Sequence, residues 1–303
     1  MSAPSVTAVV ATRDRPELLR RAVRAILGQR YDGEVECLVV FDQSRPIEPD
    51  VTTGPGRRLR VMENTHRRGL AGARNAGVEA AGAALVAFCD DDDEWMSDKL
   101  RLQVDLLGRD GGTDVVSSGI VVSYGGREVE RVTAEDRITL RHLLRSRMAE
   151  LHPSTILVRR SAWDRIGPVD EEIPGSYAED YEWLLRAARL APIAVVRRPL
   201  VRVNWHASSF FEGRWRMIAD ALTYLLGRYP EFAEEPRGLA RICGQIAFAY
   251  AGAGERDLAR HWARRALRHD KRERRAYLAL AAGLGLVRPE TVLRLAHSLG
   301  RGI

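Results

Sequence analysis

The chain has 303 residues, 45% hydrophobic and 29% charged, a composition typical of a folded globular protein of one large or two smaller domains. No run of about 18 apolar residues occurs, so no membrane-spanning helix is expected, and the first apolar run lacks the basic stretch of a signal peptide. The net charge of +6 suits an anionic partner, such as a nucleotide, a phospholipid surface or a nucleic acid, without choosing among them. Cys37, Cys89 and Cys243 are far apart in apolar stretches, which predicts buried free thiols in a reducing cytosol.

Strand and helix patterns alternate over the first 112 residues. β-rich runs at residues 5–12, 34–42, 57–64 and 83–89 predict strands, and runs with helical spacing at 15–29, 70–82 and 97–108 predict helices. This alternation predicts an α/β fold with a single, mostly parallel, Rossmann-like central sheet flanked by helices.

The pattern is more mixed after residue 112. Strands are expected at 114–126, 152–160 and 193–206, and helices at 138–148, 161–167 and 179–191. From about residue 214 the chain is predicted to be helical to its end. Residues 244–267 have the spacing of one tetratricopeptide-like hairpin, but no second copy follows. A C-terminal helical appendage is therefore predicted, and not a repeat array.

Polar clusters follow three of the predicted strands. Thr12, Arg13 and Asp14 follow the first strand, Asp42 follows the second, and Asp90–Asp93 follow the fourth. Ligands bind at the carboxyl ends of strands in parallel sheets, so these side chains are expected to converge. Consecutive carboxylates after an apolar run favour a divalent-metal site, with a solvated acidic turn or a helix N-terminus as the alternative.

Four segments, in this order, resemble family 2 glycosyltransferases: "VTAVVATRDRPELLRRAVRAIL", "ECLVVFDQS", "GLAGARNAGVEAAGAALVAFCDDDDEW" and "HPSTILVRRSAWDRIGPVDEEIPGSYAEDYEWLLRAARL". The resemblance covers about residues 5–210. It implies a glycosyltransferase A (GT-A) domain over residues 1–212, with a nucleotide-binding part to about residue 112 and an acceptor-binding part after it. Residues 213–303 would form the helical region. It also implies inverting transfer of a sugar from a nucleotide sugar to an acceptor hydroxyl.

The resemblance assigns roles to the acid cluster. Asp92 is expected to hold Mg²⁺ or Mn²⁺, Asp90 or Asp91 to face the ribose, and Asp93 to support them. A hard cation held by oxygen ligands neutralises the charge that builds on a departing diphosphate. Arg74 matches a residue that approaches the diphosphate, and a salt bridge from Arg74 to a nearby aspartate is the alternative.

The nucleotide base is expected to lie near the first two strand ends. Asp42 matches the position that accepts a hydrogen bond from a pyrimidine ring N–H, which favours a UDP- or dTDP-sugar. Thr12, Arg13 and Asp14 would complete this polar floor. Arg13 replaces a common aromatic, and its guanidinium could stack on the base or be an ordinary surface arginine. Gln43 departs from the family pattern too, which leaves the base open.

The acceptor side is expected to contain the general base. Asp180 matches the carboxylate that takes the proton of the attacking hydroxyl, with simple acidity of a helix N-terminus as the alternative. Glu179 and Trp183 would contact the acceptor, although Trp183 could equally be a core residue. His206 would lie beside the metal or the diphosphate, unless it is structural. His152 is expected to be structural.

Two other functions compete with this interpretation. A sugar nucleotidyltransferase would share the fold and the acids, but "ATRDRPELL" has no Gly-rich loop for a triphosphate. A non-catalytic nucleotide-binding or scaffold protein has only the helical tail in its favour. The acceptor could be a glycan, a lipid-linked molecule or a small natural product, and no nucleic-acid partner is expected.

The protein is expected in the cytoplasm, and the helical tail decides whether it would also attach to the membrane. Residues 260–287 combine apolar residues with many arginines. This segment is either a solvated face over packed helices or a site of peripheral attachment to anionic lipid at the inner face of the membrane.

Overall fold

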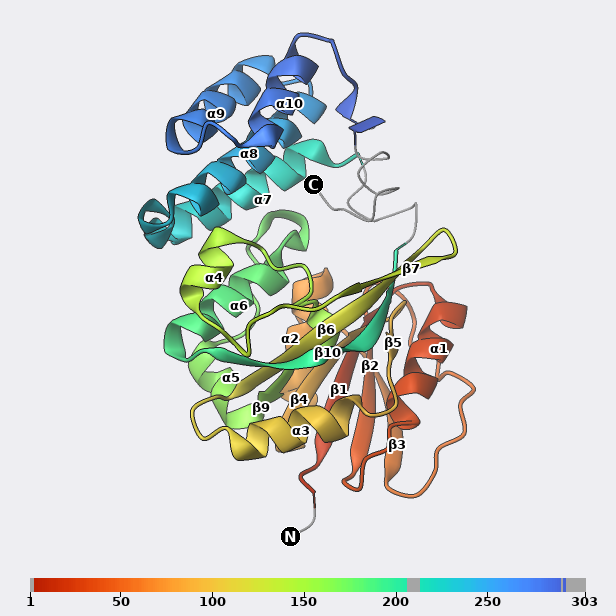
Figure 1. Cartoon of the computed structure of the whole chain (residues 1–303). Coiled ribbons are helices and arrows are strands. Elements are labelled where there is room, and N and C mark those ends of the chain that lie inside the picture. Colours follow the sequence, from red (N-terminus) through yellow and green to blue (C-terminus); the bar gives the residue numbers. More distant parts are fainter. Residues whose placement is uncertain (1–2, 206–212, 290, 293–303) are drawn as a thin grey trace. The chain divides into compact units, whose positions relative to one another are not determined.

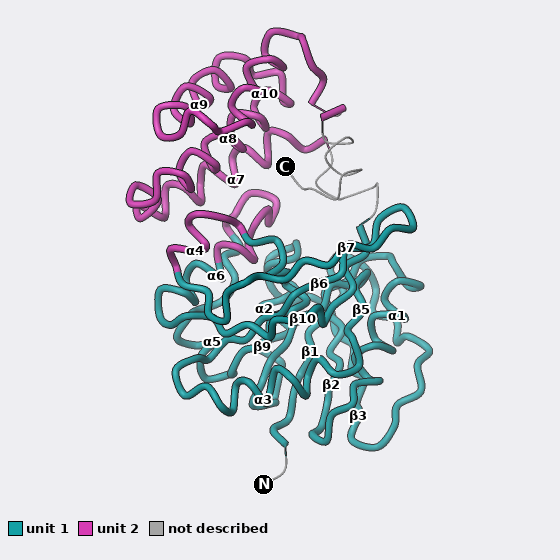
Figure 2. Tube along the Cα trace, viewed as in Figure 1, with its two compact units in different colours: residues 1–139, 148–171, 183–205 teal, residues 140–147, 172–182, 206–303 magenta. Residues whose placement is uncertain are grey.

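The computed structural model describes residues 3–205, 213–289 and 291–292. The chain divides into two compact units that are interleaved along the sequence (Figure 2): residues 1–139, 148–171 and 183–205 form unit 1, and residues 140–147, 172–182 and 206–303 form unit 2. The single domain boundary expected after residue 212 stays a prediction. Two short internal segments group with the C-terminal helices, and the helix at residues 140–145 packs against the C-terminal helix Pro236–Gly252.

Unit 1 is built on one sheet of ten strands among its described residues (Figure 1), in the order β3-β2-β1-β4-β9-β6-β10-β5, with β7 paired to β6 and β8 paired to β10. The strands are β1 (Val6–Thr12), β2 (Val35–Phe41), β3 (Arg57–Glu63), β4 (Leu85–Asp90), β5 (Glu94–Trp95), β6 (Val115–Tyr124), β7 (Arg127–Arg131), β8 (Arg137–Ile138), β9 (Leu157–Arg159) and β10 (Ile193–Asn204). The predicted α/β class with one central sheet is confirmed.

Strand direction in this sheet is mixed. The longer strands pair in parallel: β3 with β2, β2 with β1, β1 with β4, and β6 with β10. Each antiparallel pair includes one of the shorter strands β5, β7, β8 or β9. The three-residue strand β9 lies between β4 and β6 and runs opposite to both. The sheet therefore has a parallel part, β3-β2-β1-β4, which β9 joins to β6 and β10.

Helices cover both faces of the sheet. The helices of unit 1 are α1 (Pro16–Leu27), α2 (Leu70–Ala80), α3 (Lys99–Arg109), α5 (Arg160–Ile166) and the later part of α6 (Glu179–Leu190), with the short helix η1 at Pro153–Thr155. Side chains alternate along β1, so Val6, Ala8 and Val10 share one core cluster with α1 and α3. The opposite face meets α2, where Gly77 lies so close to Val9 that an added Cβ would be 2.3 Å from its Cγ1.

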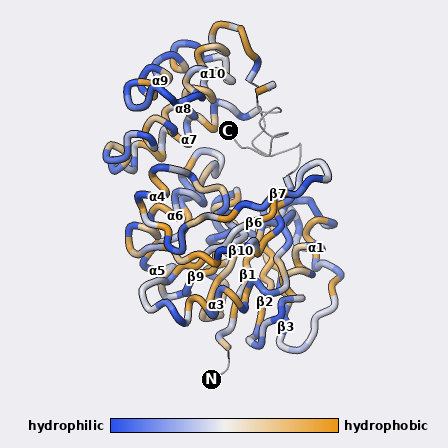
Figure 3. The backbone as a smooth tube through the Cα atoms, in the orientation of Figure 1, coloured by the Kyte–Doolittle hydropathy of each residue, from blue (hydrophilic) through white to orange (hydrophobic). Residues whose placement is uncertain are grey.

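Unit 2 is helical. It contains α4 (Leu140–Arg145), η2 (Pro174–Ser176), the first turn of α6, α7 (Trp215–Arg228), η3 (Pro230–Glu234), α8 (Pro236–Gly252), α9 (Arg256–His269) and α10 (Arg274–Gly283). Helix α8 packs closely on α4, since a Cβ added at Gly238 would lie 2.1 Å from the Leu144 carbonyl oxygen. Helix α9 is largely hydrophilic (Figure 3) and buries a narrow stripe that includes Trp262 and Ala263. The predicted C-terminal helices are confirmed.

The three cysteines are buried and free, as expected from their spacing. Across the described residues, every helix is too short or too polar to cross a membrane.

Candidate active site

The carboxyl ends of β1, β2 and β4 meet at one edge of the sheet. The parallel register pairs Thr12 with Phe41 and Ala11 with Asp90. The Asp42 backbone N–H donates to the Thr12 carbonyl oxygen at 3.0 Å. The Thr12 hydroxyl donates to Asp91 Oδ2 at 2.7 Å in a buried position. Parallel pairing thus brings together residues that are up to 79 positions apart in the sequence.

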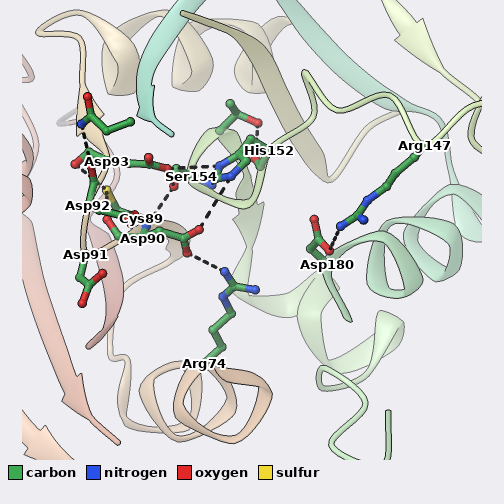
Figure 4. A network of polar contacts seen from close by, with 12 residues as sticks. Arg74, Cys89, Asp90, Asp91, Asp92, Asp93, Arg147, His152, Ser154 and Asp180 are labelled. Carbon is green, nitrogen blue, oxygen red and sulfur yellow. Dashed lines mark hydrogen bonds and ion pairs between the residues drawn. The ribbon is translucent and has the colours of Figure 1, made fainter. Parts of the chain in front are cut away.

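A histidine joins two of the acids at the end of β4 (Figure 4). Asp90, Asp93 and His152 each offer an atom suited to metal ligation, and these atoms lie within 4.8 Å of one another. His152 Nδ1 lies 3.3 Å from Asp93 Oδ2, and its Nε2 lies 3.9 Å from Asp90 Oδ2. The Ser154 hydroxyl donates to Asp93 Oδ2 at 2.5 Å and accepts from the Asp90 backbone N–H at 2.9 Å. Two carboxylates and an imidazole therefore converge on one small region.

The position of His152 results from the direction of β9. Since β9 runs antiparallel to β4, the residues just before β9 lie beside the carboxyl end of β4. Buried hydrogen bonds fix this turn: Gln103 Nε2 of α3 donates to the Thr155 carbonyl oxygen at 2.6 Å, and the Thr155 hydroxyl donates to the His152 carbonyl oxygen at 2.6 Å. A purely structural role was expected for His152, whereas its ring lies beside Asp90 and Asp93. The polar sequence "HPST" immediately before an apolar strand was the signal that could have identified it.

The acid cluster carries excess negative charge in a poorly solvated place. Burial raises the pKa of Asp92 to about 7, and the neighbouring charges of Asp90 and Asp91 add to this rise. Burial and the charge of Asp90 also hold the pKa of Asp93 well above its usual range, and burial raises that of Asp91. A nearby cation would relieve this repulsion and favour the ionised acids.

Two arginines compensate part of this charge. Arg74 Nη2 of α2 donates to Asp90 Oδ1 at 2.7 Å, which is the salt bridge considered as the alternative for Arg74. Arg15 Nη1 lies 3.0 Å from Asp92 Oδ2 and 3.3 Å from Asp91 Oδ1. Arg15 was not predicted as a site residue, although "TRDRP" places a basic residue directly before the first helix and next to a strand end.

Arg13 and Asp14 point toward solvent. Their side chains are 54% and 73% exposed, and Arg13 Nε lies 3.9 Å from Asp14 Oδ2. Asp14 adopts a left-handed backbone conformation with φ of 53°, which Asp tolerates better than most residues. The surface alternative for Arg13 fits this arrangement, and its stacking on a base stays a prediction.

The donor set suits a divalent cation. Carboxylate oxygens are preferred by Mg²⁺ and Mn²⁺, whereas an imidazole nitrogen is typically a ligand of transition metals. The combination of Asp90, Asp93 and His152 therefore offers ligand atoms suited to a divalent metal cation. Asp92 lies outside this three-residue group and contacts Arg15, so its predicted role as a metal ligand stays a prediction.

A pocket of about 380 Å³ lies at the end of β2. It is lined by Phe41, Asp42, Gln43, Ser44, Arg45, Glu63, Asn64, His66 and Arg68. Asp42 Oδ1 accepts from Asn64 Nδ2 at 2.9 Å, and Oδ2 accepts from Gln43 Nε2 at 2.8 Å and from the Gly69 backbone N–H at 3.1 Å. A carboxylate has about four acceptor positions, so Asp42 keeps room for one further donor.

Unit 2 contains the predicted base. Asp180 lies in the first turn of α6, 14% exposed, and accepts a hydrogen bond from Arg147 Nη2 at 3.1 Å (Figure 4). Burial lowers the pKa of Arg147, but the charge of Asp180 and of other neighbouring groups outweighs this and raises it overall. The guanidinium also lies 5.5 Å from the ring of Tyr177. Glu179, the neighbour of Asp180, is buried at 3% exposure.

Two predicted residues do not contribute to the described site. Trp183 is 2% exposed, donates from Nε1 to the Gly167 carbonyl oxygen at 3.1 Å, and stacks on Trp163 with ring centroids 5.2 Å apart. This packing fits the core alternative for Trp183, and its contact with an acceptor stays a prediction. His206 lies outside the described residues.

The fold defines a class, that of the GT-A glycosyltransferases. TarS of S. aureus, solved as residues 1–349 in complex with UDP-GlcNAc, matches with a TM-score of 0.64 at 16% identity, covering 98% of this chain and 92% of that one. The mannosyltransferase PcManGT of Pyrobaculum calidifontis, solved with GDP-Man and Mn²⁺, matches with a TM-score of 0.57 at 20% identity, covering 95% and 82%. At these identities the likeness concerns the fold alone.

The chain belongs to glycosyl transferase family 2. The model of this family matches residues 7–167, more than half of the chain. The succinoglycan biosynthesis protein ExoO of Rhizobium meliloti (strain 1021) is 35% identical over 127 residues, which are 42% of this chain and 36% of that protein. The chain spans from about a fifth to about half of the length of the curated relatives it matches. The resemblance seen in the sequence is confirmed.

Proposed function

We propose that this chain transfers a sugar from a UDP- or dTDP-sugar to an acceptor hydroxyl with inversion, in a reaction that depends on a divalent cation. The observation that supports this most is the convergence of Asp90, Asp93 and His152 at the carboxyl end of β4. The strand that carries Asp90 lies beside β1, which in turn lies beside the strand that leads to Asp42. A cation site and a polar pocket on the two strands that flank β1 suit the diphosphate and the base of one nucleotide.

The donor base would lie in the pocket at the end of β2. Asp42 is held by three donors and has one acceptor position left, which suits the ring N–H of a uracil or thymine. Thr12 holds Asp91 in place through its buried hydroxyl, so that Asp90 or Asp91 could accept from the ribose. Arg13 and Asp14 are exposed beside this edge and are available to a bound base.

The diphosphate would be bound by the acids and arginines at the end of β4. Asp90, Asp93 and His152 would hold the cation, with Asp92 as the ligand implied by the family pattern. When bound, Mn²⁺ or Mg²⁺ would neutralise the negative charge that develops on the leaving diphosphate. Arg74 and Arg15 are already close to the acids, and each offers a guanidinium fork that fits phosphate oxygens.

Asp180 would act as the general base on the acceptor hydroxyl. A single base on the acceptor side favours one in-line displacement, which inverts the anomeric centre. Arg147 donates a hydrogen bond to one carboxylate oxygen of Asp180 and so orients the carboxylate. Glu179 is buried beside it and would shape the acceptor side. The acceptor would be a glycan, a lipid-linked molecule or a small natural product, and the reaction would take place in the cytoplasm.

Thermal denaturation with nucleoside diphosphates tests this proposal. The protein is melted with UDP, dTDP, GDP or ADP, each with and without Mn²⁺. A ligand at 100 times its dissociation constant stabilises by about 2.7 kcal/mol, which corresponds to a rise in Tm of about 5–11 °C for a domain of this size. UDP or dTDP is expected to give the largest rise, and only with Mn²⁺. A larger rise with GDP would refute the base assignment, and no rise with any nucleotide would refute the function.

A further inference from the structure

The turn between β3 and α2, residues 64–69, contains a histidine whose ring contacts two carboxylates. His66 Nε2 lies 2.7 Å from Glu79 Oε2, near the end of α2. His66 Nδ1 lies 3.0 Å from Glu171 Oε1, in the segment that follows α5. The two acids are far from His66 in sequence, and all three residues belong to unit 1. His66 thus ties the turn to two separate elements.

This arrangement requires a protonated ring. A neutral imidazole carries one N–H and can donate to only one carboxylate, whereas an imidazolium donates from both nitrogens. The hydrogen bond to Glu79 raises the pKa of His66, burial opposes this rise, and the bond to Glu171 adds to it. Burial would raise the pKa of Glu171, but its bonds to Asn75 and His66 outweigh burial and lower it. Both shifts favour the charged pair.

Glu171 holds the turn through further hydrogen bonds. It accepts from Asn75 Nδ2 of α2 at 2.6 Å and from the Arg67 backbone N–H at 3.1 Å. Asn75 itself is bound to the backbone of Val169 through both atoms of its amide. The charged groups near His66 are Glu79 on α2, Glu171 after α5, Arg67 and Arg68 in the turn, and Glu63, Asp42 and Arg45 at the adjoining strand ends.

The turn also shapes the pocket at the end of β2. The His66 backbone N–H donates to Asn64 Oδ1 at 2.9 Å, and Asn64 Nδ2 donates to Asp42 Oδ1 at 2.9 Å. His66 itself lines the pocket. His66, whose ring lies between the two carboxylates, therefore also binds Asn64, the residue that donates to Asp42.

We propose that His66, as an imidazolium, is a positioning residue for the donor pocket, so that affinity for a nucleoside diphosphate falls when the ring loses its proton. This inference rests on the proposed function of the pocket. Because the pKa of His66 in the folded protein is raised above about 6.5, the ordinary value for histidine, the ring is mostly protonated at pH 6.5 and loses its proton as pH rises through the higher value. The contribution to affinity should therefore be present at low pH and absent at high pH.

Anaerobic calorimetric titration with UDP and Mn²⁺ at pH 6.5 and 9.0 tests the proposal, using the wild type, His66→Gln and the control His261→Gln. His261 is an exposed residue on α9 of unit 2. The ratio of the dissociation constants of His66→Gln and the wild type, taken at each pH, removes the effect of every other titrating group. We expect this ratio to be about 3- to 10-fold at pH 6.5, from the loss of a charged hydrogen bond, and close to one at pH 9.0.

The outcomes separate this inference from the proposed function. A ratio of one at both pH values would show that His66 does not position the pocket. The same elevated ratio at both pH values would show a role that does not need the proton, and would overturn the proposal too. Glu171→Gln should reproduce the loss at pH 6.5. If the wild type binds UDP, dTDP and GDP at neither pH, the proposed function itself fails, and this inference fails with it.

Discussion

Gly72, in the first turn of α2, allows the backbone of the 64–69 turn to approach the helix. A Cβ at this position would lie 1.9 Å from the Arg67 carbonyl oxygen, whereas real Cβ contacts stay above 3.0 Å. In Gly72→Ala the Arg67 peptide must therefore move by about 1 Å. The Arg67 carbonyl oxygen accepts from Asn64 Nδ2 at 3.0 Å, and the Arg67 backbone N–H donates to Glu171 Oε2 at 3.1 Å, so a shift of the Arg67 backbone would strain both hydrogen bonds.

The expected effect on stability is modest. Overpacking of this kind costs about 1–3 kcal/mol, and the helix preference of Ala over Gly returns about 1 kcal/mol. The free energy of unfolding should therefore fall by up to about 2 kcal/mol, which lowers Tm by up to about 8 °C. Gly108→Ala in α3 is a matched control, since nothing lies within 4 Å of its added Cβ. That substitution should stabilise by about 0.4–1 kcal/mol.

The expected effect on binding is larger, because the moved turn carries Asn64 and His66, which line the Asp42 pocket. A misplacement of about 1 Å can cost up to about 100-fold in function, and we expect the dissociation constant for UDP to rise at least about 10-fold in Gly72→Ala. Thermal denaturation and calorimetric titration of both variants measure the two effects. A Gly72→Ala protein that melts and binds UDP like Gly108→Ala would refute this reasoning.

Three further predictions concern the cation, the base and the helical tail. Asp92→Asn should keep the fold and lose most transfer activity, because an amide is a poorer ligand for a hard cation; full wild-type turnover in excess EDTA would contradict the metal dependence. Asp180→Asn should lower kcat by about 10²- to 10⁴-fold with little change in donor binding, whereas the exposed control Asp257→Asn should leave kcat unchanged. NMR of the anomeric proton in the product should show inversion, and retention would exclude the single displacement. Residues 260–287 should pack within the helical unit, because the apolar stripe of α9 is already buried. Co-sedimentation with anionic vesicles should therefore stay at background, and salt-sensitive binding would instead reveal a membrane contact.

Local sequence patterns were sufficient for the long elements. The strand expected at 83–89 is observed at Leu85–Asp90, and the helix expected at 70–82 is observed at Leu70–Ala80. The strand expected at 152–160 is reduced to Leu157–Arg159. Pro153 has no backbone N–H, and the His152 side chain accepts from the Ser154 N–H, so this stretch begins as the turn η1 instead of a strand. The pattern of hydrophobic residues does not predict short-range polar hydrogen bonds of this kind.

The amino-acid sequence by itself determined the family, the α/β class and the edge of the sheet where the polar residues meet. It could do so because apolar periodicity specifies parallel strands, and the carboxyl ends of parallel strands lie together. Only the tertiary structure decided which side chains complete the site. His152 reaches Asp93 because β9 runs antiparallel to β4, and His66 reaches Glu171 across 105 residues because the segment after α5 lies against α2. Strand direction and packing of distant segments depend on the whole core, and no local pattern of residues records them.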